Sequence, residues 1–390
     1  MNRAIVIGAG FSKAIANAPL VNELFGLIYQ KTKGDDETRP QWHVDRQHFL
    51  DVVCYLQNQA KPLIDFLERD GTQIETYKDI PDLYPINIEY LCTILDLNIE
   101  RPYVPKGIGV DLKSCPIPFM RGLTVDQLRG ARDFITYYIV KLLLPDRLTP
   151  DKDLLDRTLS FVDAGDVVIT FNYDLLVEQA LWRKKLWNPL DGYGIGEIEK
   201  YEEIDASNLT KSKVSVIKLH GSVNWGHEIE IYTTHPFTNE PLFEGLKVKS
   251  NRVIPKWNYP LTHHVVIPTY MKSVRQRWEL QLVKMASEAI SKAKEIFILG
   301  YSFPEADAMA SFIFTPMKED AHIKIVDKYN AIELAGRFAK NYGIRYENII
   351  FEQSDIKTWA DNNFKYKAYE EEISKRKEIE SFINFAKNNL

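Results

Sequence analysis

The stretch DVVITFNYDLL at residues 166–176 decides the fold of this chain. Its apolar run Val167–Thr170 predicts a short buried strand, and a helical pattern follows it. The polar residues Asn172 and Asp174 come just after the strand. In open α/β sheets, ligands bind just outside the carboxyl ends of the strands. The stretch therefore predicts a strand of such a sheet and one edge of a functional site.

In two more stretches, candidate site residues directly follow a predicted strand. Ala4–Ile7 is apolar without alternation, which is typical of a strand buried on both faces of a parallel sheet, and the turn GAGFS at 8–12 follows it. Val214–Leu219 predicts another strand, which ends at His220. Backbone N–H groups at a glycine turn and helix start can hold a phosphate, because no side chain intervenes and the helix dipole is positive there. We expect these strand ends to face one dinucleotide site, although the third glycine of a full GxGxxG is absent and a plain strand-to-helix turn stays possible.

The rest of the chain predicts a Rossmann-like α/β fold. Three further apolar runs, at 295–299, 323–326 and 349–352, bring the parallel sheet to about six strands with helices on both faces. An ordinary dinucleotide fold has a second strand ending in an acidic residue about 20 residues after the glycine turn, and none is found here. Residues 20–160 instead show apolar residues at helical spacing. We expect a large helical insertion after the first strand, covering the site.

The domain organisation follows from this pattern. We expect one domain over residues 1–361, interrupted by the mostly helical insertion at about 20–160. Residues 362–390 form a predicted C-terminal helix of mixed charge. Two interpretations of this helix stay open, a solvated terminal helix or a contact for a partner or a second copy of the chain.

Composition limits the classes of function. The chain has 390 residues, of which 45% are hydrophobic and 26% charged, as in ordinary globular proteins. Its net charge of −5 gives no overall electrostatic case for nucleic acid. The three cysteines, Cys54, Cys92 and Cys115, form no CxxC pair, so we expect no metal site, reduced thiols and a cytoplasmic location. No apolar run approaches the roughly 20 residues that span a bilayer, so we expect no membrane contact.

Four motifs, in order, resemble those of the sirtuin superfamily. They are GAGFS at 8–12, TFNYD at 170–174, LHGS at 219–222 and GYSFP at 300–304. The chain is most similar to the zinc-less SIR2-like NAD hydrolases of bacterial antiphage defence. Unlike protein-deacylating sirtuins, it has no Asp-Phe-Arg element after the glycine turn and no four-cysteine zinc module after the histidine. These departures argue against deacylation and leave NAD cleavage possible.

The resemblance implies roles for particular residues. Asn172, Asp174 and His220 would form the reaction centre at the nicotinamide ribose, and the glycine turn would bind the phosphates of NAD. Ser302 and Asp327 follow later strands, where they would hold the adenosine ribose. The residues that we expect to bind NAD are Gly8, Ala9, Gly10, Phe11, Ser12, Thr170, Gly221, Ser222, Gly300, Ser302 and Asp327.

The implied chemistry is cleavage of the nicotinamide–ribose bond, in which the ribose carbon acquires oxocarbenium character. As a hypothesis, His220 is a general base, since an unperturbed imidazole titrates near neutrality. Asn172 would orient the ribose or a water, and Asp174 would accept from a hydroxyl or support Asn172. The products would be nicotinamide and linear or cyclic ADP-ribose. The family further implies a homo-oligomer that depletes NAD in abortive infection, often with a HerA-type ATPase as partner.

Two other functions stay open from the sequence. The protein could transfer an acyl group or ADP-ribose to or from another protein, which requires a peptide groove. It could also be a non-catalytic sensor that binds NAD or ADP-ribose and signals through assembly. Replacement of His220 by alanine separates these readings, because a sensor has no turnover to lose.

Overall fold

The computed structural model describes residues 3–32, 42–69, 87–99, 123–194, 209–225, 265–268, 277–304 and 307–362. Beyond Asn362, the predicted C-terminal helix lies outside these residues, as does Cys115. Within them, the prediction of a Rossmann-like α/β fold is confirmed. The strands are β1 (Arg3–Ile7), β2 (Val167–Thr170), β3 (Ser215–Lys218), β4 (Glu295–Leu299), β5 (His322–Val326) and β6 (Ile349–Glu352).

The six strands form one parallel sheet in the order β3-β2-β1-β4-β5-β6. Ile7, the last residue of β1, lies opposite Thr170 of β2 and Leu299 of β4. Thr170 in turn lies opposite Lys218, the last residue of β3. The loops after β1, β2, β3 and β4 therefore start at one level of the sheet. The strand order reverses between β1 and β4, and this switch point is where such sheets bind ligands.

Helices cover the sheet and extend beyond its carboxyl edge. Those of the sheet layers are α1 (Ala9–Ala16), α7 (Lys152–Thr158), α8 (Leu176–Arg183), α9 (Arg277–Lys292), α10 (Ala308–Phe314), α11 (Ala331–Tyr342) and α12 (Ile356–Asp361), with a short 3-10 turn at Tyr346–Asn348. Helices α1, α7 and α12 contact one another. Helix α9 packs on α10 and β3, and α11 packs on β5 and β6.

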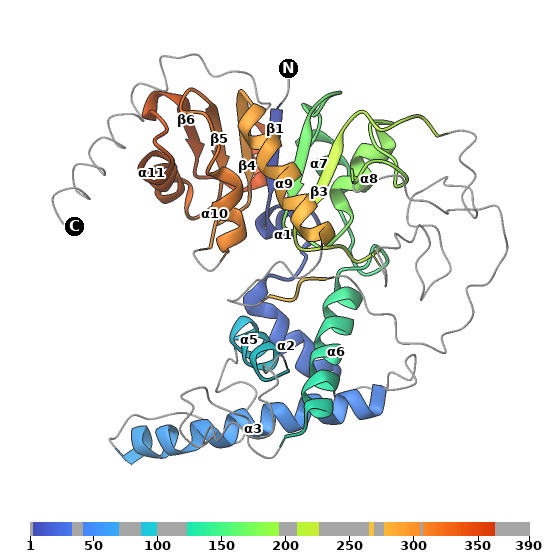
Figure 1. Cartoon of the computed structure of the whole chain (residues 1–390), viewed down its shortest axis with the longest axis vertical. Helices are drawn as coiled ribbons and strands as arrows, with labels where there is room; N and C mark the ends of the chain where they lie inside the picture. The colour runs from blue at the N-terminus through green and yellow to red at the C-terminus, as the bar shows by residue number, and fades with distance from the viewer. Residues whose placement is uncertain are drawn as a thin grey trace, which may run out of the picture.

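Helix α7, the last helix within the expected insertion at about 20–160, packs with α1 and α12, whereas the helices before it form a separate helical layer. It consists of α2 (Val21–Lys31), α3 (Trp42–Arg69), α5 (Ile88–Ile99) and α6 (Val125–Leu142). In Figure 1 these helices lie below the sheet, on the side to which β1 runs from the N-terminus at the top. Helix α6 contacts the other three. Aromatic rings fill the contact between α3 and α6, where the ring centres of Phe49 and Phe134 are 5.0 Å apart. The carboxyl edge of the sheet therefore faces this helical layer.

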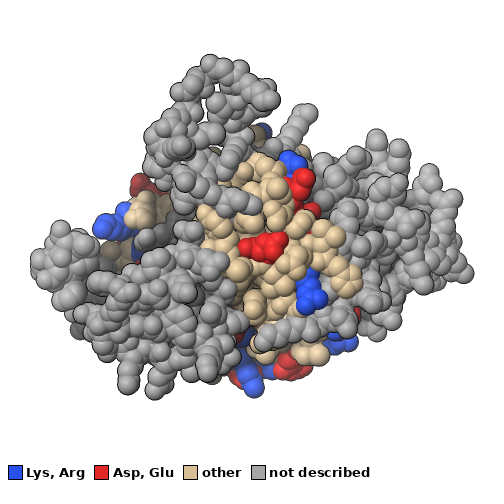
Figure 2. All heavy atoms as spheres, turned by 90° about the horizontal axis from the view of Figure 1, so that it is seen from below, with Lys and Arg blue, Asp and Glu red and all other residues tan. Residues whose placement is uncertain are grey.

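Charge is mixed on the side of the molecule seen from below. Acidic and basic side chains are scattered there among uncharged ones in the part of the surface that is described (Figure 2). Among the described helices, none combines the length and the apolar character that crossing a membrane requires.

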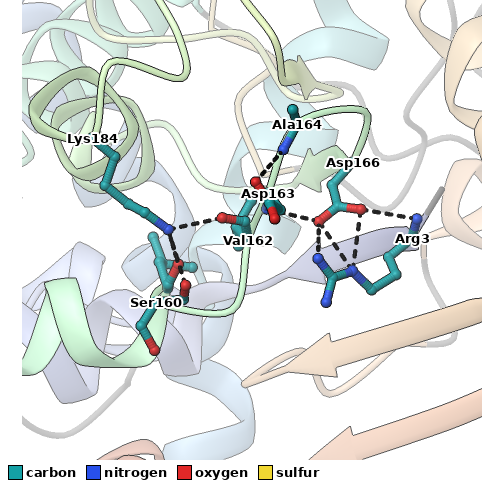
Figure 3. A network of polar contacts seen from close by, with 8 residues as sticks. Arg3, Ser160, Val162, Asp163, Ala164, Asp166 and Lys184 are labelled. Atoms are coloured by element: carbon teal, nitrogen blue, oxygen red, sulfur yellow. Dashed lines mark hydrogen bonds and ion pairs between the residues drawn. The ribbon is translucent and has the colours of Figure 1, made fainter. Parts of the chain in front are cut away.

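An ion pair fixes the opposite, amino-terminal edge of β1 against the residue that enters β2. The backbone N–H of Arg3 donates to Asp166 Oδ1 at 3.1 Å, and the Arg3 Nη2 donates to Asp166 Oδ2 at 2.7 Å. The same carboxylate accepts the Asp163 N–H, while Lys184 Nζ donates to three carbonyls of the preceding turn, those of Leu159, Ser160 and Val162 (Figure 3). The Asp166 side chain is fully buried. This network sets the register of β1 against β2.

Replacing Asp166 by alanine removes the acceptor of the Arg3 and Asp163 backbone N–H groups and leaves the Arg3 guanidinium without its partner. We expect Asp166→Ala to lower the free energy of unfolding by about 3 kcal/mol, as when one member of a buried pair is removed. Urea denaturation, followed by circular dichroism, measures this free energy of unfolding. As a control, Asp153→Ala breaks an exposed pair with Arg157 on α7 and should barely move the midpoint. Equal midpoints for the two variants would contradict the role of the ion pair.

Candidate active site

The glycine turn after β1 interlocks with the end of β4. The Gly8 N–H donates to Leu299 O at 3.2 Å, and the Gly10 N–H donates to Gly300 O at 2.8 Å. A Cβ on Gly8 would lie 2.5 Å from Tyr301 Cδ2, and Gly300 has a φ of +59°. Position 8 therefore requires glycine because of the close contact with Tyr301. Position 300 requires glycine because of its positive φ as well. Because the Gly10 N–H already has an acceptor, a phosphate at this turn would have to share or replace that bond.

Three buried polar side chains form a chain of hydrogen bonds beside this turn. Ser12 Oγ, on α1, donates to Asp174 Oδ2 at 2.6 Å. Asn172 Nδ2 donates to Ser12 Oγ and to Gly8 O, each at 2.8 Å. Both hydrogens of the Asn172 amide are thus used, and among the described residues no donor is seen at Oδ1. This oxygen can accept a hydrogen bond from a ligand.

Asp174 and Thr170 hold the turn that carries Asn172. Asp174 Oδ1 accepts the Leu176 N–H at the start of α8, and Thr170 Oγ1 accepts the Asn172 N–H at 3.1 Å. Asp174 is therefore connected to Asn172 through Ser12 rather than directly. Of the two roles expected for Asp174, this geometry supports the second, that of a support for Asn172.

His220 lies against the same turn. Its ring contacts Phe171 O through Nδ1 at 3.1 Å and Asp307 Oδ2 through Nε2 at 3.2 Å. Gly221 follows with a φ of +79°, which the left-handed turn after β3 requires. The backbone carbonyl of His220 accepts the Val266 N–H at 2.9 Å. Since Phe171 directly precedes Asn172, the structure brings the imidazole, the amide and the glycine turn to one place.

The other sequence-predicted residues divide into two groups. Ser222 is fully buried and donates to Tyr173 O at 3.4 Å, so it lies beside the reaction-centre residues. Ser302 is exposed, and Asp327 Oδ1 accepts the N–H groups of Tyr329 and Asn330 where α11 begins. No described contact joins Ser302 or Asp327 to Asn172 or His220. Their role at the adenosine ribose stays a prediction.

Sequence reasoning missed Asp307 and the ring of Tyr301 as parts of this site. Asp307 caps α10 through Oδ1, which accepts the Ala310 N–H at 3.2 Å, and the Tyr301 hydroxyl donates to its Oδ2 at 3.2 Å. The Tyr301 ring stacks on Phe171 with centres 4.2 Å apart. Burial, and then the nearby Asp307 carboxylate, raises the pKa of Tyr301 well above its usual range, so the hydroxyl stays a donor. An aspartate before an apolar run signals only a helix cap, which is why the sequence did not reveal this contact.

A fully buried ion pair supports the turn from behind. Lys218 Nζ lies 2.8 Å from Glu178 Oε1 on α8 and donates to Asp174 O at 2.5 Å. Burial raises the pKa of Glu178, an effect that Lys218 opposes. The Tyr193 hydroxyl donates to the same Glu178 oxygen at 3.2 Å. The sequence signal for this pair is the lysine that ends the otherwise apolar run SVIK, because a buried lysine needs a partner.

The helical layer reaches this site through α5. Burial raises the pKa of the Tyr173 hydroxyl above its usual range, and the neighbouring Cys92, Asp307 and Glu89 act in the same direction. Cys92 and Glu89 belong to α5. The Tyr173 hydroxyl donates to Val266 O at 2.6 Å. The layer between β1 and β2 therefore brings α5 near Tyr173, while its role as a cover over the site stays a prediction.

The strand order and the polar cluster at the switch point define a Rossmann-like protein with its ligand-binding groups at the carboxyl edge of the sheet. Residues 166–346 match the family model described as a SIR2-like domain, so the resemblance to the sirtuin superfamily is confirmed. A SIR2-like domain implies an NAD-dependent activity. Among the described residues, no group of three or more His, Cys, Asp or Glu side chains is arranged to hold a metal ion.

Comparison with solved structures gives distant matches. One is Sir2 in complex with the inhibitor EX-527, 2'-O-acetyl-ADP-ribose and a deacetylated p53 peptide, at 12% identity and a TM-score of 0.34, covering 93% of this chain and 91% of that chain. Another is Sir2Tm bound to a propionylated peptide, at 12% identity, a TM-score of 0.32 and the same coverage of both chains. No curated protein matches the chain.

A methyl group on Gly8 tests the interlock. We expect Gly8→Ala to destabilise the fold by about 1–3 kcal/mol, because the added Cβ meets Tyr301 at 2.5–2.6 Å and overpacking costs about that much. The matched control is Gly336→Ala in α11, where nothing lies within 4 Å of the added Cβ and alanine favours the helix. Thermal unfolding of the two variants should move in opposite directions. A stable Gly8→Ala protein would show that β1 and β4 separate easily at this end.

Proposed function

We propose that the protein is an NAD glycohydrolase that cleaves the nicotinamide–ribose bond to give nicotinamide and ADP-ribose. The observation that carries the proposal is the hydrogen-bonded chain Asn172–Ser12–Asp174 beside His220, at the switch point of the sheet. The SIR2-like match over residues 166–346 supports NAD as the substrate. No metal is part of the proposal.

Each polar side chain of the site has a role in this reaction. The bond to nicotinamide breaks with positive charge developing on the ribose, and nicotinamide leaves as a neutral group, so the site needs no general acid. Asn172 offers Oδ1 to a ribose hydroxyl or to the attacking water, while its nitrogen is fixed by Gly8 and Ser12. The Asp174 carboxylate, 4% exposed, contributes negative charge behind Ser12. His220 then takes the proton from the water or hydroxyl that attacks.

The biological setting that we propose comes from the family resemblance. We propose that the protein acts in the cytoplasm, as a homo-oligomer, and depletes NAD in antiviral defence through abortive infection. A HerA-type ATPase is the proposed partner. Protein deacylation and ADP-ribosyl transfer are less favoured, because the chain lacks the cysteines of a zinc module after Cys115.

One observation favours a second candidate, a non-catalytic sensor of NAD or ADP-ribose. Both ring nitrogens of His220 face protein oxygens, Phe171 O and Asp307 Oδ2. A substrate hydroxyl reaches a ring nitrogen only by sharing or replacing one of these contacts. A sensor would keep them and bind the nucleotide without turnover.

Incubation of the purified protein with NAD, followed by chromatography of released nicotinamide, tests the hydrolase. We expect His220→Ala to lower kcat by about 100-fold or more, the usual range for loss of a general base, while calorimetry still detects NAD binding. Asn172→Ala should lower kcat as well, because the ribose or the water is no longer oriented. The control is His322→Ala, which changes an exposed histidine at the amino end of β5 and should leave turnover intact. NAD binding without any nicotinamide release, with and without the partner ATPase, would replace the hydrolase by the sensor.

A further inference from the structure

The imidazole of His220 lies between two acceptors. Nδ1 is 3.1 Å from the carbonyl oxygen of Phe171, and Nε2 is 3.2 Å from Oδ2 of Asp307. Both side chains are buried, with 7% of the His220 side chain and 1% of the Asp307 side chain exposed. At such burial, facing acceptors without a hydrogen between them repel strongly.

The placement of the acceptors assigns the hydrogens. A carbonyl can only accept, so Nδ1 carries a hydrogen. The neutral tautomer that has this hydrogen leaves a lone pair on Nε2, which would face the Asp307 carboxylate. The contact is favourable only when one more proton lies between Nε2 and Oδ2, where the imidazole, as the stronger base, carries it. The pair therefore holds a proton that a neutral histidine beside an ionised aspartate would not.

Asp307 is held in place independently of His220. Its Oδ1 accepts the Ala310 N–H and its Oδ2 accepts the Tyr301 hydroxyl, each at 3.2 Å. The Tyr301 ring is fixed in turn by its stack on Phe171, with an interplanar angle of 4°. Phe171 O closes the loop at His220 Nδ1. The four residues His220, Asp307, Tyr301 and Phe171 thus form a closed ring of contacts.

We propose that Asp307 is the positioning residue of His220, and that the two side chains share one proton between Asp307 Oδ2 and His220 Nε2. Phe171 O fixes the other side of the imidazole. In the NAD glycohydrolase proposed above, on which the catalytic part of this inference rests, His220 becomes a base only when that shared proton has left the pair. Asp307 thereby decides at which pH the base exists.

Other titratable groups around the pair come from three elements. Tyr301 follows β4 and Tyr173 follows β2, and burial raises the pKa of both hydroxyls, so they stay neutral donors across the working range. Cys92 and Glu89 approach from α5, and burial raises the pKa of the Cys92 thiol above its usual range. Glu89 is a half-buried carboxyl near Tyr173 and, like Asp307, raises the pKa of that hydroxyl.

The pH dependence of kcat/KM for NAD tests the pair, and two variants are expected to move it in opposite directions. Asp307→Asn keeps a helix cap but removes the negative charge that holds the proton, so the acid limb should move to lower pH by about one to three units. Tyr301→Phe keeps the ring on Phe171 but removes a donor to Asp307, so the carboxylate attracts the proton more strongly and the limb should move to higher pH. If the acid limb moved in the same direction in both variants, or did not move, the proposal would be overturned.

The control is Asp355→Asn, because Asp355 caps α12 through the Thr358 N–H much as Asp307 caps α10. It has no described contact with His220, and its profile should match that of the unchanged protein. An acid limb that moves as much in Asp355→Asn as in Asp307→Asn would show a general effect of lost charge and overturn the assignment.

A second measurement does not depend on turnover. In protein labelled with ¹⁵N at its eight histidines, His220→Gln identifies the His220 signals by their loss. We expect both His220 nitrogens to carry hydrogens at pH 7.5 in the unchanged protein, and only Nδ1 in Asp307→Asn. A neutral, singly protonated His220 in both proteins would overturn the shared proton. If the protonation states are as expected but no NAD is cleaved, the proposed function fails and the pair stands.

Discussion

The hydroxyl of Ser12 joins the two halves of the site, and the arrangement of the strand ends depends on it. It donates to Asp174 and accepts from Asn172, so a residue of the first helix is bonded to a turn 160 residues later in the chain. All three side chains are buried, where an unpaired polar atom is costly. A hydroxyl can serve both neighbours because it donates and accepts at once. The amide of Asn172 is oriented as a result.

Much of the fold was predictable because each buried parallel strand leaves a strong local signal. Three of the six strands, β2, β4 and β6, have the bounds that their apolar runs predict. Strands β1 and β5 begin one residue earlier, and β3 is shorter by one residue at each end. The convergence of Asn172 and His220 followed from the common level at which parallel strands end. That inference needed no knowledge of the helical insertion.

The contacts between side chains were not predictable from the same patterns. Asp307 lies 87 residues from its imidazole partner and looks in the sequence like an ordinary helix cap. The Lys218–Glu178 pair depends on α8 packing behind β3, which no spacing in the sequence reveals. The bond from Gly10 to Gly300 likewise depends on how closely β1 and β4 approach. Burial and long-range packing, rather than local pattern, determine these three features.

Two buried pairs of side chains contact the turn that carries Asn172, the Lys218–Glu178 ion pair and the His220–Asp307 pair. Lys218 donates to the Asp174 carbonyl, while the His220 ring contacts the Phe171 carbonyl. Buried pairs are poor contributors to stability, since desolvation consumes most of their attraction. Their location at a single turn is more easily understood as fixing its backbone.

The central position of β1 has a consequence for how the chain is made. Arg3 pairs with Asp166, 163 residues later, and β1 also lies beside β4, which begins only at Glu295. At ordinary rates of translation, roughly 15 to 60 seconds pass before the ribosome has supplied both neighbours of this strand. The helices of the separate layer after β1 pack on one another, and the last of them ends at Leu142, so they are supplied well before then. Until then, the nascent chain carries an apolar strand with at least one unpaired edge, and a chaperone that binds such segments has a clear place to act.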